Sequence, residues 1–308
     1  MDKLVGSMSK LSPELVGVGA VGVLGSLMTA AVLWTRWGVA SGSGKGSSAW
    51  RRGGAASGGM QDGAKTTPVS TNGNDVHARP KHVAIVMDGN RRYGRLKSGN
   101  AMSGHWEGGK TLVNVIEWCV EEGLDMLTVY AFSTENWSRD AAEVDTLMTI
   151  FVQYATTLLE EALKNNVRVK VLCTDGARLP AKVSEATKEL EAKTGKCTGF
   201  LVNVCLSYGS RADIVQAAQA LAEEVAAGIR TAASIDEEAL ASRLVTAGLP
   251  DPDILIRTSG EYRLSNFLLW QLAYTEMFFI DKLWPELSRN DLTDIFQQYS
   301  ERARRFGK

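Results

Sequence analysis

The sequence predicts an α/β protein with a single doubly wound, mainly parallel sheet flanked by helices. From about residue 80 onward, short apolar runs rich in β-branched residues alternate with longer segments whose apolar residues recur at helical spacing. This alternation is typical of parallel strands joined by crossover helices. The chain has 308 residues, of which 44% are hydrophobic, so it can bury a large core.

The first 75 residues differ in composition from the rest. Residues 15–34 carry no charge and match the length of a membrane-spanning helix, so residues 1–40 are predicted to be a tail that holds a membrane anchor. A cleaved targeting peptide and a dispensable tail are the alternatives. More basic residues follow this segment than precede it, which places the downstream part in the cytosol. Residues 41–75, rich in glycine and serine, are predicted to be a flexible linker that leads to a globular domain over residues 76–308.

Strands and helices alternate through the globular domain. The strands are predicted at Val83–Met87, Met126–Phe132, Val167–Cys173, Leu201–Tyr208, Asp253–Arg257 and Met277–Leu283. The helices are predicted from near Arg91 and at Thr111–Glu121, Val144–Lys164, Ala181–Lys193, Arg211–Ala227 and Glu237–Val245. Open parallel sheets bind ligands beyond the carboxyl ends of their strands, so the polar residues that directly follow these runs form the candidate site.

The first strand ends in a polar turn with two arginines. Val83–Met87 is followed in order by Asp88, Gly89, Asn90, Arg91, Arg92 and Tyr93. The free N–H groups of a helix start and two guanidiniums suit a phosphate group. A carboxylate beside bound phosphate usually needs a divalent cation between them, so Asp88 is a candidate Mg²⁺ ligand. The alternative is an Asp-Gly hairpin turn with solvated arginines.

The second strand ends in another polar cluster. It is followed by Ser133, Thr134, Glu135, Asn136, Trp137 and Arg139. If the first two strands are neighbours, this cluster lies beside the Asp88 turn. The serine and the asparagine can relay a proton, and the arginine can hold a phosphate. An N-cap and turn before the next helix is the alternative.

The strand at Asp253–Arg257 ends in an arginine, and the turn after it returns Arg263 and Ser265 toward Arg257. Two arginines and a hydroxyl can clamp a diphosphate. Surface arginines that pair with Glu261 are the alternative.

Composition argues against several other functions. A net charge of −1 gives no reason to expect nucleic-acid binding, and the globular domain, residues 76–308, has no G-x-G-x-x-G motif for a nucleotide. The four cysteines lack metal-ligand spacing and are expected to be reduced core residues, and no zinc site is expected at His77 or His82. His105, near a helix start, could donate to phosphate, although a lone histidine is more often structural.

These motifs resemble those of the cis-prenyltransferases, the family of undecaprenyl diphosphate synthase and dehydrodolichyl diphosphate synthase. The resemblance runs from about His82 to the last residues, with the motifs in the family's order. They are Lys81–Tyr93, Gly104-His105, Tyr130–Arg139, Asp253–Phe267 and Arg304–Gly307.

The resemblance implies an enzyme that condenses an allylic diphosphate, expected to be farnesyl diphosphate, with successive isopentenyl diphosphates. The product would be a long Z-polyprenyl diphosphate, a dolichol precursor. Asp88 and Asn136 would be catalytic, and Asp88 and Glu276 would hold Mg²⁺. The substrate-binding residues implied are Gly89, Asn90, Arg91, Arg92, Tyr93, His105, Ser133, Thr134, Glu135, Trp137, Arg139, Arg257, Arg263, Ser265, Arg305 and Gly307.

The resemblance also bears on assembly and location. The helix Val144–Lys164 carries an apolar stripe, for which core packing is the default interpretation. In the family, the corresponding helix also walls a hydrophobic tunnel. The Arg305-Phe306-Gly307 tail implies a homodimer in which it reaches the partner's isopentenyl diphosphate. The expected location is the endoplasmic reticulum membrane, with the domain facing the cytosol. A non-catalytic accessory subunit is the alternative, which the complete Asp88 and Asn136 motifs disfavour.

The chain departs from the family pattern beside His105. The family usually has an arginine four residues before this histidine, and this chain has Ala101, so Arg95 or Lys97 is expected to substitute. The sequence Arg91-Arg92-Tyr93 resembles eukaryotic members, whereas bacterial members usually have Gly-Arg-Trp.

Overall fold

The computed structural model describes residues 79–302. The predicted anchor at 15–34, the linker at 41–75 and the tail residues Arg305 and Gly307 lie outside the described residues. No helix within residues 79–302 is long and apolar enough to cross a membrane.

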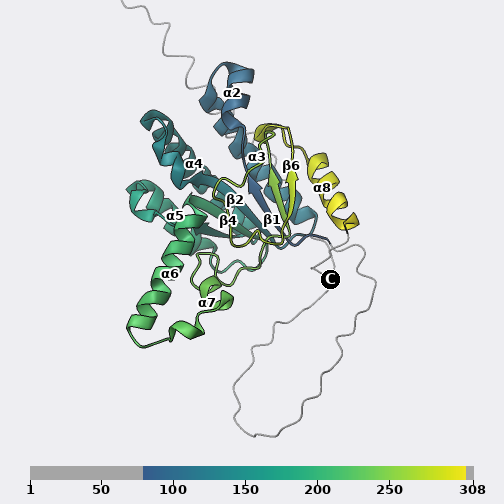
Figure 1. Cartoon of the computed structure of the whole chain (residues 1–308). Coiled ribbons are helices and arrows are strands. Elements are labelled where there is room, and N and C mark those ends of the chain that lie inside the picture. Colours follow the sequence, from purple (N-terminus) through teal and green to yellow (C-terminus); the bar gives the residue numbers. More distant parts are fainter. Residues whose placement is uncertain (1–78, 303–308) are drawn as a thin grey trace, which may run out of the picture. The chain divides into compact units, whose positions relative to one another are not determined.

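The described part of the chain forms one six-stranded, all-parallel sheet flanked by helices, which confirms the predicted fold class. The order of strands across the sheet is β3-β4-β2-β1-β5-β6 (Figure 1). The strands are β1 (His82–Val86), β2 (Met126–Ser133), β3 (Arg168–Leu172), β4 (Leu201–Tyr208), β5 (Ile254–Arg257) and β6 (Glu276–Phe279).

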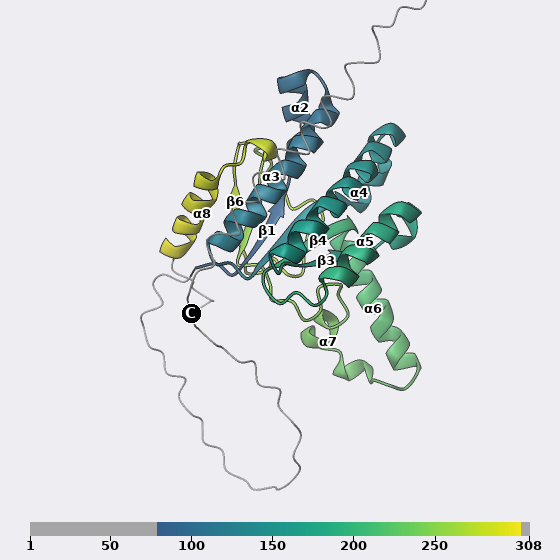
Figure 2. The same ribbon diagram turned by 180° about the vertical axis from the view of Figure 1, so that it is seen from behind.

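The helices are α2 (Asn90–Ser98), α3 (Ala101–Glu121), α4 (Ala141–Lys164), α5 (Ala181–Thr194), α6 (Ser210–Ala226), α7 (Glu237–Ala241) and α8 (Arg289–Glu301). Short 3₁₀ turns include η2 (Thr134–Ser138) and η5 (Trp284–Glu286). Helices α3 and α4 cross the face of the sheet seen in Figure 2.

Several predicted boundaries are wrong. Helix α3 begins ahead of the predicted Thr111, because Asn100 caps it by accepting a hydrogen bond from the Met102 N–H at 2.9 Å. Strand β6 ends at Phe279 because the chain then turns to meet the loop after β5, where Ser259 N donates to the Lys282 carbonyl at 2.7 Å. Helix α7 ends at Ala241, and α8 was not predicted.

The register of the central strands aligns the candidate residues. Strand β1 lies between β2 and β5, and Val86 pairs with both Tyr130 and Arg257. The residues that follow these three strands therefore lie level at one edge of the sheet. Strand β1 is buried along its whole length, as expected for a central parallel strand.

Helices α2 and α3 pack closely at a glycine contact. A Cβ atom on Gly104 would lie 1.8 Å from the Asn90 carbonyl oxygen, so no larger residue fits there without a backbone shift. This contact fixes Asn90, at the start of α2, against the second turn of α3.

Candidate active site

An ion pair between Asp88 and Arg257 forms the centre of the site. Asp88 Oδ2 accepts a hydrogen bond from Arg257 Nη2 at 2.8 Å. The Arg257 side chain is 3% exposed, whereas that of Asp88 is 33% exposed and open to solvent. Thr258 Oγ1 donates to the Asp88 carbonyl at 2.7 Å and accepts from the Asp88 N–H at 3.0 Å, which fixes the backbone of the turn.

Gly89 makes the turn after Asp88 possible. Its φ of 100° lies in the left-handed region, and a Cβ atom there would lie 2.9 Å from Leu283 Cδ2. Its N–H donates to Asp88 Oδ1 at 2.7 Å. The residue thus serves as the N-cap of α2 and orients the carboxylate.

The loop after β5 is partly assembled as predicted. Arg257 Nη1 donates to Ser265 Oγ at 2.8 Å and also to the Arg263 carbonyl. The Arg263 guanidinium itself points elsewhere, because it pairs with Glu261 and is 60% exposed. Arg92, which donates to Ser259 Oγ, also approaches Glu261, with Nη2 and Oε1 3.6 Å apart. Arg257 and Ser265 are therefore brought together, and Arg263 stays at the rim.

The loop after β2 lies beside the Asp88 turn because β1 and β2 are neighbours. Asn136 Oδ1 accepts from the Ser133 N–H at 3.2 Å, so the capping interaction considered from the sequence is present. Trp137 Nε1 donates to Ser207 Oγ at 2.8 Å, and the indole packs edge-on against Phe132. Thr134 and Glu135 also lie in η2, where Glu135 Oε1 accepts from Asn266 Nδ2 at 2.8 Å.

Two arginines meet at one buried carboxylate. Glu143, in the first turn of α4, has an 8% exposed side chain. Its Oε2 lies 3.3 Å from Arg91 Nη1, and its Oε1 accepts from Arg139 Nη1 at 3.0 Å. The two guanidiniums outnumber the carboxylate, so the cluster keeps a net positive charge.

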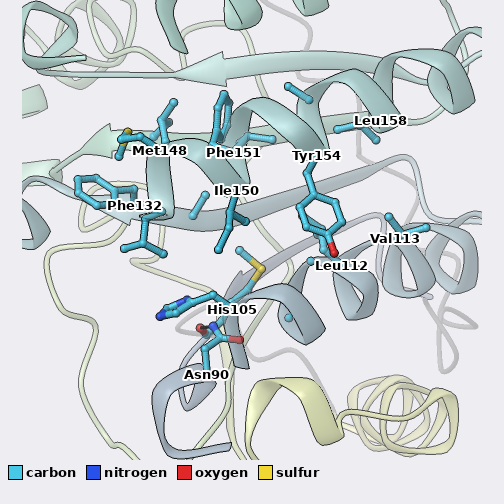
Figure 3. A pocket seen from close by; sticks show the side chains of 18 of the residues that line it. Asn90, His105, Leu112, Val113, Phe132, Met148, Ile150, Phe151, Tyr154 and Leu158 are labelled. Atoms are coloured by element: carbon cyan, nitrogen blue, oxygen red, sulfur yellow. Dashed lines mark hydrogen bonds between the residues drawn. The ribbon is translucent and has the colours of Figure 1, made fainter. Parts of the chain in front are cut away.

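An apolar cavity of about 140 Å³ opens beside this cluster, between α3, α4 and the sheet. Its polar end is formed by Asn90 and His105, which Figure 3 shows lying together below Phe132 and Ile150. Asn90 Oδ1 and His105 Nε2 are buried there without a hydrogen-bond partner. Residues of the predicted α4 stripe line its wall, among them Leu147, Met148, Phe151, Ala155 and Leu158.

His105 is neutral near pH 7. The pKa of its imidazole is lowered to about 4, first by burial and then by the nearby Arg139 and Arg91 guanidiniums, while Glu143 opposes them. A neutral imidazole can still donate one N–H to an anion.

Residues 86–307 match the family model described as "Putative undecaprenyl diphosphate synthase". The chain belongs to the cis-prenyltransferase family. An isoprenyl transferase of Geobacillus kaustophilus is 43% identical over 243 residues, which cover 79% of this chain and 94% of that protein. A tritrans,polycis-undecaprenyl-diphosphate synthase (geranylgeranyl-diphosphate specific) of Pyrococcus horikoshii is 44% identical over 230 residues, covering 74% and 87% respectively.

Solved structures are similar as well. Lavandulyl diphosphate synthase from Lavandula x intermedia, in complex with dimethylallyl diphosphate, is 34% identical with a TM-score of 0.73, covering 76% of this chain and all of that one. A probable undecaprenyl diphosphate synthase from Campylobacter jejuni is 36% identical with a TM-score of 0.62, covering 75% of this chain and all of that one.

The second metal ligand expected in this cis-prenyltransferase does not lie at the site. Glu276 pairs in register with Ile254, which pairs with Val83 at the opposite end of β1 from Asp88. At about 3.3 Å per residue, roughly 15 Å of strand separates the two carboxylates. Glu276 Oε2 instead pairs with Arg302 Nη1 at 2.5 Å. Asp88 and Glu276 of the same chain therefore do not lie close enough to hold one ion in this structure, and a metal-binding role of Glu276 stays a prediction.

Asp88 by itself still fits a magnesium ion. Mg²⁺ is commonly held by one or two carboxylates together with substrate phosphate oxygens and water. Within residues 79–302 no group of three acidic, histidine or cysteine side chains could hold a metal alone, so the substrate would have to supply oxygens.

Three residues of the site were not predicted from the sequence. Glu143 pairs with two arginines of the site, Thr258 forms hydrogen bonds with the backbone of Asp88, and Ser259 accepts a hydrogen bond from Arg92. One signal was available for Glu143, because it stands four residues after Arg139, in the first turn of the helix that follows this arginine. Tyr93, which was predicted to bind substrate, lies under Lys97, whose Nζ is 5.8 Å from the ring centroid.

Proposed function

We propose that this cis-prenyltransferase condenses an allylic diphosphate, farnesyl diphosphate first among the candidates, with isopentenyl diphosphates to give a long Z-polyprenyl diphosphate. One observation carries the proposal. The cationic cluster of Arg91, Arg139 and Glu143 lies at the polar end of the apolar cavity, where Asn90 and His105 line the wall. One ligand with an anionic head and a hydrocarbon tail therefore suits both.

The allylic diphosphate would lie at the polar end of the cavity. When its C–O bond ionises, negative charge grows on the leaving diphosphate. Arg91, Arg139 and a neutral His105 are fixed donors that can stabilise that charge. Gly89 and Asn90, at the start of α2, add the positive end of the helix dipole.

Asp88 would hold Mg²⁺ against the diphosphate oxygens. The bound ion would supply Lewis-acid stabilisation of the leaving group. Asp88 is suited to this because its carboxylate is oriented by the Gly89 N–H and by Arg257 but remains partly exposed.

Isopentenyl diphosphate would be held by the loop after β5. Arg257 and Ser265 are already joined by a hydrogen bond, and the exposed Arg263 could turn from Glu261 to the substrate. Because the loops after β1, β2 and β5 share one edge, the second substrate's double bond would lie near the developing allylic cation. Asn136, in the loop between them, is the candidate for handling the proton lost after attack.

The growing chain would enter the cavity along α4. A cavity of about 140 Å³ is close to the size that accepts one benzene in other proteins, so it holds roughly one isoprene unit. Elongation would therefore require α3 and α4 to separate as the product lengthens.

Three finer assignments belong to the same proposal. The product would serve as a dolichol precursor, the enzyme would act on the endoplasmic reticulum membrane with its domain in the cytosol, and it would be a homodimer. The eukaryote-like Arg91-Arg92-Tyr93 sequence supports the first assignment, the uncharged segment 15–34 the second, and the Arg305-Phe306-Gly307 ending the third.

The test is incorporation of radiolabelled isopentenyl diphosphate by the purified chain alone, with farnesyl diphosphate and Mg²⁺. We expect butanol-extractable labelled product that depends on all three additions. Activity that appears only after a second gene product is added would instead support the accessory-subunit alternative.

A further inference from the structure

Glu143 is the one component of the cationic cluster that does not suit an anionic substrate. Its carboxylate is buried, which costs free energy unless positive groups compensate it. Each of its oxygens meets a different guanidinium, Oε2 that of Arg91 and Oε1 that of Arg139. These arginines come from α2 and from the end of η2, so the carboxylate ties two separate segments together.

The arginines keep donors available while Glu143 holds them. Arg91 Nε is buried without a hydrogen-bond partner, and so is the nearby His105 Nε2. A buried guanidinium N–H with no acceptor is unusual in a folded protein and indicates a missing acceptor. The unpaired Arg91 Nε and the net positive charge both indicate an anion as the missing acceptor.

The other basic residues of α2 do not share this arrangement. Arg92, Arg95 and Lys97 are exposed; Arg92 donates to Ser259 Oγ, and Lys97 lies over the Tyr93 ring. Ala101, in contrast, stands one helical turn before His105 on α3, so a side chain there lies over the same face of that helix.

We propose that Glu143 is a positioning residue that fixes Arg91 and Arg139 as a pair aimed at the diphosphate of the allylic substrate. The pair would supply the positive charge that Ala101 does not. This inference rests on the proposed function and deepens it by naming the residue that positions the two arginines for the allylic diphosphate.

The first test removes and relocates the charge. In Arg91→Ala we expect kcat/KM for farnesyl diphosphate to fall about 10- to 100-fold, as for the loss of one charge-assisted hydrogen bond, with KM for isopentenyl diphosphate within twofold. The inhibition constant of inorganic pyrophosphate against farnesyl diphosphate should rise similarly. The double variant Arg91→Ala/Ala101→Arg should recover most of both losses.

The second test removes the positioning group and keeps its shape. Glu143→Gln should lower kcat/KM for farnesyl diphosphate at least about 10-fold although it makes the site more positive, because the guanidiniums lose their fixed direction. Glu143→Asp, which keeps the charge, should lose less. The matched control is Arg289→Ala, which removes a remote arginine–glutamate pair with Glu121 and should leave all kinetic constants within twofold.

Several results would overturn the inference. They are Glu143→Gln kinetics within twofold of wild type, a lower melting temperature in that variant with unchanged kinetics, or Arg91→Ala losses that fall on isopentenyl diphosphate. A larger loss in Arg95→Ala or Lys97→Ala than in Arg91→Ala would also overturn it. Wild-type protein that incorporates no isopentenyl diphosphate would contradict the proposed function instead, and pyrophosphate binding measured by calorimetry would still test the arginine pair.

Discussion

Asp88 and Arg257 stand 169 positions apart in the sequence, yet their side chains form an ion pair of 2.8 Å. The contact exists because β1 and β5 are neighbours in the sheet and Val86 and Arg257 are in register. Arg257 is nearly fully buried, and this carboxylate compensates its buried positive charge. The pair joins the turn that is proposed to hold Mg²⁺ to the loop that would hold isopentenyl diphosphate.

Replacement of Asp88 is expected to abolish turnover and leave the fold intact. Asp88→Ala removes the carboxylate that is proposed to couple Mg²⁺ to the leaving diphosphate, so kcat should fall by at least about 10²-fold. The lost partner of Arg257 should lower the free energy of unfolding by about 1–3 kcal/mol, since Asp88 is partly solvated. Steady-state assays and urea unfolding measure the two effects.

Asp145→Ala, at an exposed position of α4, is the control for Asp88→Ala and should change neither quantity appreciably. Full activity with normal metal dependence in Asp88→Ala would show that the turn has another role.

Much of this arrangement could be predicted from the sequence. Apolar runs end directly before Asp88, Ser133 and Arg257, and any parallel sheet places such residues at one edge. Strand order could not be predicted, because it depends on pairings between distant segments. It determines that β1 separates β2 from β5 and that Glu276 begins β6 at the far end.

Local signals explain other differences. The capping box of Ser288 and Asp291 could have revealed α8, whose apolar residues are few. His82, which looked unpartnered in sequence, is buried between the Thr128 hydroxyl at 2.7 Å and the Pro250 carbonyl at 2.8 Å. Its neighbours come from β2 and from the segment before β5, so no spacing rule indicates them.

Stability is expected to fall in mild acid. Burial holds the pKa of His105 at about 4, whereas an unfolded histidine titrates near 6.5, so between these values the unfolded chain binds a proton that the folded chain does not. The contribution of His105 to the free energy of unfolding is fully present above about pH 6.5 and declines as the pH falls toward 4. The largest possible loss is on the order of 3 kcal/mol. Burial lowers the pKa of His82 as well, with the same sign.

Urea unfolding at a series of pH values between 4.5 and 7.5 measures this dependence. His105→Gln should flatten part of the slope, because it removes one of the two groups. Equal stability across this range in the wild type would contradict the burial of both imidazoles in their neutral form.

Tyr154 is expected to limit product length. Its hydroxyl donates to the Trp106 carbonyl at 2.7 Å, and its ring packs so tightly on Gly109 that a Cβ there would lie 2.2 Å from Tyr154 Cζ. The residue thus holds α4 against α3 at the cavity wall. Tyr154→Ala should shift products longer by at least one isoprene unit, as measured by mass spectrometry.

Tyr154→Phe keeps the ring and serves as the matched variant, with a length distribution between wild type and Tyr154→Ala. An unchanged distribution in Tyr154→Ala, with activity retained, would place the limit on length elsewhere.

Arg305 is expected to bind isopentenyl diphosphate across a dimer interface. Arg305→Ala should raise KM for this substrate by about 10- to 100-fold, the equivalent of 1.5–3 kcal/mol for a charge-assisted contact. KM for farnesyl diphosphate should change little. A heterodimer of one Arg305→Ala subunit and one Asp88→Ala subunit should regain activity. One of its two sites combines an intact Asp88 with an intact tail from the partner subunit.

Heterodimers that form and remain inactive would contradict the sharing of tails between subunits. Capture of the untagged variant through an affinity tag on the other variant establishes whether they form.

The geometry of the newly formed double bonds tests the central claim most directly. Purified protein supplied with farnesyl diphosphate, ¹³C-labelled isopentenyl diphosphate and Mg²⁺ should yield a polyprenyl diphosphate whose added units are Z by nuclear magnetic resonance, with the E bonds of the primer retained. Added units with E geometry would contradict the account. The absence of any condensation by folded wild-type protein would contradict it as well.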